Sequence, residues 1–82
     1  MNSKLIHSYD FSEDGGFVVE YRIVSDNDIH KCELVKYIDG VESETALSLP
    51  FPSEEEARRL IDILYKCKVT PMHLKYILKD SF

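Results

Sequence analysis

The chain has 82 residues, a formal net charge of −5, 44% hydrophobic residues and two cysteines. This composition excludes a disordered chain, a disulfide framework, and a transmembrane helix, which needs roughly 18 apolar residues in a row. We therefore expect one cytoplasmic domain over residues 1–82, with no export signal and no membrane contact.

The first part of the chain, about residues 3–49, predicts four strands separated by turns. Side chains alternate with the two-residue period of a strand from Leu5 to Phe11 and from Phe17 to Val24. Turn signals follow at Asp14-Gly15-Gly16, in the polar run 25–28, and at Asp39-Gly40. Because these turns are short, neighbouring strands are expected to be antiparallel. The purer apolar face of the second strand is the expected core face, and it comprises Phe17, Val19, Tyr21 and Ile23.

The third and fourth predicted strands differ in how clearly they divide into two faces. Residues 29–38 carry apolar side chains on both faces, which favours a central strand or a bulge. One face of this strand carries Cys32, Leu34 and Ile38, and the other carries Ile29, Val35 and Tyr37. Residues 41–49 predict a strand with one wet side, and the opposite side comprises Val41, Thr45, Leu47 and Leu49.

Two helices are predicted after the prolines at 50 and 52, which end the sheet because proline lacks a ladder N–H. Ser53 and Glu56 form a capping box that begins a helix over about 54–67. Thr70 is a good N-cap, and Pro71 at the first helical position begins a second helix over about 71–80. The inward stripe of the first helix is expected to comprise Ala57, Leu60, Ile61, Leu64 and Lys68.

The predicted fold class follows from this order of elements. We expect an α+β domain in which a four-stranded antiparallel β-meander is followed by a C-terminal αα-hairpin packed on one sheet face.

The sequence offers few residues for catalysis or metal binding. His30, Cys32, Cys67 and His73 are the candidate metal ligands, but neither pair has the spacing of a structural zinc site. Gly15-Gly16 lies between two strands, so it does not form a phosphate loop at a helix start. No local signature marks a nucleophile and its base. We expect no enzyme activity, cofactor, metal or small-molecule ligand.

Charge is divided unevenly along the chain. Residues 1–52 hold 4 basic and 10 acidic side chains, whereas residues 53–82 hold 6 basic and 5 acidic ones. The spacing of the pair of helices over 60–79 resembles a helix-turn-helix, in which His73, Lys75 and Lys79 would contact DNA. An acidic domain binds phosphates poorly, so a DNA-binding regulator is the alternative, and nucleic acid is not the expected partner.

Protein binding is the preferred interpretation. One pair of helices covers one face of a sheet, so the apolar residues of the other face would remain available to a partner or a second copy. These candidate residues are Val18, Val24, Ile29, Val35 and Tyr37. We therefore expect a non-enzymatic interaction module, with a homodimer through a sheet face or edge as one form. The chain's five tyrosines are compatible with an interface or with the rim of the core.

The segment 53–80 also resembles a known family. Its capped acidic helix from Ser53, its Val69-Thr70-Pro71 break and its terminal amphipathic helix are similar to a bacterial domain-of-unknown-function family, found mainly in Gram-positive anaerobes. The tyrosine-containing strand 16–23 matches the same family's pattern. The resemblance implies short strands before two helices and a cytoplasmic location. It supplies no catalytic residue.

Overall fold

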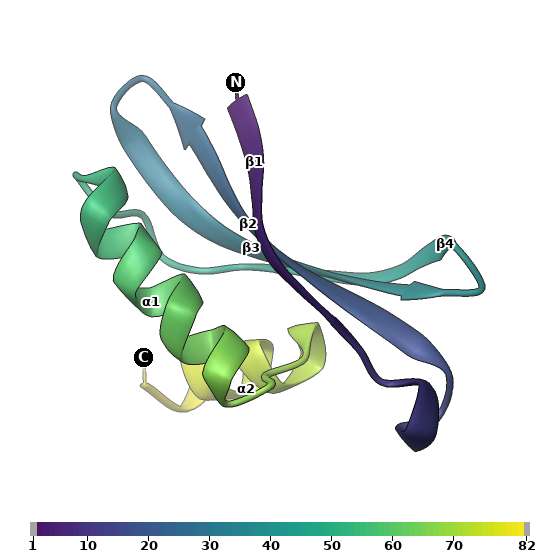
Figure 1. The fold of residues 1–82 in the computed structure, drawn as a ribbon. Coiled ribbons are helices and arrows are strands. Elements are labelled where there is room, and N and C mark those ends of the chain that lie inside the picture. Colours follow the sequence, from purple (N-terminus) through teal and green to yellow (C-terminus); the bar gives the residue numbers. More distant parts are fainter. Residues whose placement is uncertain (1, 82) are drawn as a thin grey trace.

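A computed structural model describes residues 2–81, except for the side chains of Asp14 and of residues 79–81. Four strands form one antiparallel sheet in chain order: β1 (Asn2–Asp10), β2 (Phe17–Asp26), β3 (Ile29–Ile38) and β4 (Val41–Leu47). Two helices follow, α1 (Glu54–Lys66) and α2 (Pro71–Ser81). Figure 1 shows both helices on the same side of the twisted sheet. The predicted α+β class, with an antiparallel meander and two helices packed on the sheet, is confirmed.

The hairpin turns lie where the polar residues predict them. Both central residues of the β2–β3 turn have positive φ, at 49° for Asn27 and 64° for Asp28. Asp39 and Gly40 repeat this pattern in the β3–β4 turn, with φ of 52° and 79°. Positive φ at both positions gives a two-residue turn the twist of the strands that it joins. The β1–β2 connection is longer and contains a 3₁₀ turn, η1 (Ser12–Asp14), which the sequence did not predict.

The hydrophobic core lies between the sheet and the helices. Val19, Tyr21 and Ile23 of β2 are fully buried, as the alternation predicts. From β3, Cys32 and Leu34 point into the same core. The contributions of the helical part are Ala57, Ile61, Leu64, Val69 and Leu74. Helix α1 packs over β1, β2 and β3, whereas α2 packs mainly over β4.

Both helices begin at the predicted caps. The Ser53 hydroxyl accepts a hydrogen bond from the Glu56 N–H at 3.2 Å, and the Thr70 hydroxyl accepts one from the His73 N–H at 3.4 Å. Helix α1 ends at Lys66 with Cys67 as its C-cap, and Lys68 follows in the left-handed region with a φ of 53°. There the Val69 N–H donates to the Leu64 carbonyl, as in a Schellman cap. Lys68 is therefore exposed beyond the helix, and its predicted place in the buried stripe was wrong.

The strand faces depart from the expected alternation in two places. A bulge between Leu5 and His7 places Leu5 across from Arg22 and His7 across from Tyr21, so Leu5 leaves the face that His7 shares with the core. In β4 and the residues after it, Ala46 and Ser48 are the buried side chains. Leu47 and Leu49, expected on the dry side, are 45% and 47% exposed. Helix α2 packs on β4, so the side chains of this edge that face the helix are small ones.

Candidate interaction surface on the open sheet face

The sheet face opposite the helices, here called the open face, carries all five residues of the predicted interaction surface. The register places Val18 directly across from Tyr37, and Val35 across from Glu20. Directly paired residues of antiparallel strands point to the same side of the sheet. Val24 and Ile29 follow on this side at the far ends of β2 and β3. The two-residue alternation therefore brings the five together on one face.

These five residues differ in how much of each is accessible. Ile29 is 48% exposed, while Val18, Val24 and Tyr37 are half-buried. Val35 is only 3% exposed although both helices lie on the other face, because neighbouring side chains of the central strands surround it. A partner would therefore contact the margins of this face before its centre.

Charged side chains lie among the apolar ones. Arg22 forms an ion pair with Glu20 at 2.9 Å, and both side chains are about a quarter exposed, at 26% and 22%. Arg22 also lies across from Glu33 on β3. Partial burial and the neighbouring Glu20 carboxylate raise the pKa of Tyr37 above its ordinary value. The centre of the open face is thus polar, with apolar groups on either side of it.

Two shallow hollows lie at the two ends of the open face. One, of about 350 Å³, is mostly apolar and has Val24, Ile29, Leu47 and Pro50 in its wall. The other, of about 380 Å³, lies at the opposite ends of β2 and β3. Its wall contains Val18 and Tyr37 together with three carboxylates, and these are Asp10, Glu20 and Asp39.

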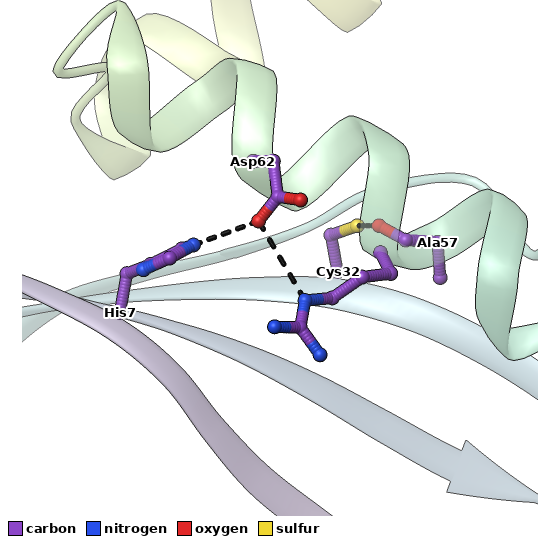
Figure 2. Close-up of polar contacts among 5 residues, drawn as sticks. His7, Cys32, Ala57 and Asp62 are labelled. Carbon is purple, nitrogen blue, oxygen red and sulfur yellow. Dashed lines mark hydrogen bonds and ion pairs between the residues drawn. The ribbon is translucent and has the colours of Figure 1, made fainter.

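A separate polar cluster connects β1 to α1. The Nε2 atom of His7 lies 2.7 Å from Asp62 Oδ1, and Figure 2 shows the imidazole and the carboxylate pointing toward each other. Arg58 approaches the same oxygen at 3.6 Å, and the His7 ring stacks on Tyr65 with centroids 4.2 Å apart. The hydrogen bond from His7 lowers the pKa of Asp62, as does the Arg58 charge. This cluster holds the strand to the helix.

The candidate metal ligands are not brought together. His30 Nδ1 lies 2.7 Å from the Ser25 hydroxyl, and the Cys32 thiol donates to the Ala57 carbonyl at 3.1 Å inside the core (Figure 2). Burial raises the pKa of Cys32 to about 11, so its sulfur is protonated at neutral pH. Cys67 is exposed. Across the described residues, no group of three His, Cys, Asp or Glu side chains is placed to hold a metal ion.

The residues of the predicted DNA-contact alternative lie on α2. The side chains of His73 and Lys75 are exposed there, and that of Lys79 lies outside the described residues. DNA binding by this helix stays a prediction. Neither α1 nor α2, as described, is long and apolar enough to cross a membrane.

Comparison with known proteins gives one result. A model of a family described as "Family of unknown function (DUF6514)" matches residues 2–82. The chain belongs to this family. The predicted resemblance to a domain-of-unknown-function family is therefore confirmed. No curated protein and no solved structure matches the chain.

In this DUF6514 chain, sequence reasoning missed two exposed residues of the open face. Leu5 is 48% exposed there because the β1 bulge reverses its direction. Leu47 is on this face because it pairs with Glu33 of β3. The alternation of 41–49 does show that Thr45 and Leu47 share a face, but it does not show which face the helices cover.

Proposed function

We propose that this protein is a non-enzymatic protein-binding module and that the open face of its sheet is the binding surface. The observation that carries the proposal is the placement of Val18, Val24, Ile29, Val35 and Tyr37 on the face opposite both helices. Leu5 and Leu47 extend the same face onto the outer strands. Apolar surface that is not covered within a chain is a frequent site of protein contact.

The absence of enzyme activity is part of this proposal and has support in the chemistry of the thiol and the imidazoles. The Cys32 thiol is buried and donates to a backbone carbonyl, so it is a poor nucleophile. The His7 imidazole is hydrogen-bonded to Asp62, and the His30 imidazole is hydrogen-bonded to Ser25. We also propose a cytoplasmic location, because the unpaired thiols of Cys32 and Cys67 suit a reducing compartment.

Site-specific photo-cross-linking in the native cells tests the binding surface. A photoreactive phenylalanine analogue replaces Ile29 in one variant and Leu47 in another, because both side chains are exposed on the open face at 48% and 45%. The matched control carries the analogue at Ile63, which is 56% exposed on α1. These positions lie outside the buried core, so the three variants should fold alike.

The proposal expects discrete cross-linked products from positions 29 and 47 and none from position 63. A product of about twice the 9.5 kDa chain would identify a second copy, and other masses would identify another protein by mass spectrometry. Products from position 63 alone would place binding on the helical side and overturn the proposal. Absence of products from all three positions would also contradict it.

A further inference from the structure

The charges of the open face are strongly unbalanced. The strand register places five carboxylates on it, against the two cations Arg22 and Lys31. The carboxylates are those of Asp10, Glu20, Asp26, Glu33 and Glu42. Arg22 is already engaged by Glu20 at 2.9 Å. The open face therefore carries a net negative charge around its apolar side chains.

The negative charge is concentrated at one end. Asp10, Glu20 and Asp39 line the hollow beside Tyr37, and no basic side chain of the described residues contributes to its wall. Asp10 accepts a hydrogen bond from the Ser12 N–H at 2.9 Å, which holds the carboxylate in place. Among the described residues, neither Asp10 nor Asp39 has a salt bridge. A cationic side chain of a partner would meet the carboxylates of Asp10 and Asp39 here, and that of Asp10 is held by its hydrogen bond.

The opposite end is mostly apolar. Val24, Ile29, Leu47 and Pro50 line its hollow. The charged side chains at its wall are Lys31 and the two carboxylates of Asp26 and Glu33, so it is less negative than the hollow at the other end. Val18 and Val24, which mark the two ends, are six residues apart on β2, or about 20 Å at the rise of a strand. A partner that contacts both ends must carry its basic and apolar groups at this separation.

We propose that the open face binds a basic, apolar segment of another protein, with Lys or Arg side chains at the Asp10–Asp39 end and aliphatic side chains at the Ile29–Leu47 end. This inference rests on the proposed function and names the chemistry of the partner. A second copy is disfavoured because contact between two open faces would bring together two surfaces that each carry more carboxylates than cations, and like charges in an interface cost binding energy.

A titration of the ¹⁵N-labelled protein with two synthetic peptides tests this chemistry. The basic peptide, of about 12 residues, carries Lys and Arg in one half and Leu and Val in the other, which spans the required distance when extended. Its acidic twin carries Asp and Glu in place of Lys and Arg. Amide shifts identify the surface that each peptide contacts, and titrations at about 0.05 M and about 0.5 M salt measure the electrostatic part.

The basic peptide is expected to shift amides of β2, β3 and the β3–β4 turn, with weaker binding at high salt. The double substitution Asp10→Asn with Asp39→Asn should weaken binding about tenfold, since two exposed ion pairs of moderate strength are lost. The matched control is Glu54→Gln with Glu55→Gln, which removes the same charge from exposed positions of α1 and should leave binding unchanged.

Other results would overturn the inference in distinguishable ways. Equal binding of the acidic peptide to the open face would refute the basic partner while leaving the binding surface intact. A shift of α1 or α2 amides alone would refute both the partner chemistry and the surface. No shift with about 1 mM basic peptide would refute the partner chemistry, and the products at positions 29 and 47 would then decide the proposed function separately.

Discussion

The substitution Tyr21→Phe tests how the sheet is joined to the break between the helices. Tyr21 is fully buried in β2, and its hydroxyl donates to the Val69 carbonyl at 2.9 Å. Phenylalanine keeps the ring but leaves that buried carbonyl without this donor. Removing one partner of a buried hydrogen bond costs about 1–2 kcal/mol. The total stability of a chain of 82 residues is about 4–12 kcal/mol, so the loss is measurable.

Urea denaturation followed by circular dichroism is the assay. With a slope of roughly 1 kcal/mol per molar urea, the midpoint should fall by about 1–2 M. Tyr76→Phe is the matched control, since Tyr76 is 61% exposed on α2 and its change should move the midpoint little. Equal midpoints for Tyr21→Phe and the wild type would refute the importance of this hydrogen bond.

The same pair of proteins has a distinctive alkaline dependence. Burial, together with the charges of Tyr65 and Tyr9, raises the pKa of Tyr21 to about 12 in the folded state. The unfolded chain therefore releases this proton near pH 10 while the folded chain holds it, so wild-type stability falls from about pH 10 to about pH 12. The loss over this window is about 3 kcal/mol. The Tyr21→Phe variant lacks this loss, so the stability difference between the two proteins should shrink above pH 10 and change sign before about pH 12. A constant difference would refute the reasoning.

Four further predictions concern the turns, caps and packing. Asp28→Gly should raise stability by about 0.5–1 kcal/mol in thermal unfolding because φ is 64° there, while Asp28→Ala should not. Ser53→Ala should lower the stability by about 1 kcal/mol in urea, because the α1 cap is lost. Leu64→Ala should cost about 2–5 kcal/mol, and Ile63→Ala, at an exposed site, much less. Because the pKa of Asp62 is lowered in the folded protein, its ionised carboxylate stabilises the fold above the ordinary carboxyl pKa, and this stabilisation is lost as the pH falls through the folded pKa. Asp62→Asn should therefore make the unfolding midpoint less dependent on pH in this acid range.

Local rules were sufficient for much of the fold. Ser53 and Thr70 begin the helices where their hydroxyls accept backbone N–H groups. The pairs at 27–28 and 39–40 make tight turns because their residues tolerate positive φ. Alternation alone divided β3 into its two faces, and it placed Ile29, Val35 and Tyr37 together. Each of these signals lies within a few residues of the structure that it predicts.

Errors occurred where a residue's environment depends on distant segments. The bulge at Leu5 arises in the pairing of β1 with β2, and no turn or proline marks it in the sequence. Likewise, α2 packs on β4, so small Ala46 and Ser48 are buried while larger Leu47 points away. Hydrophobicity alone favours Leu47 as the core residue. The position of α2 decides otherwise, and it cannot be read from the residues near Leu47.

The sequence by itself determined the order of elements, their caps and turns, and the alternation that assembles the open face, because each depends on the conformational preferences of neighbouring residues. Only the tertiary structure decided which face the helices cover, that His7 meets Asp62 across 55 positions, and that Asp10 and Asp39 line one hollow. These features depend on strand register and helix placement, which are set by the packing of the whole core.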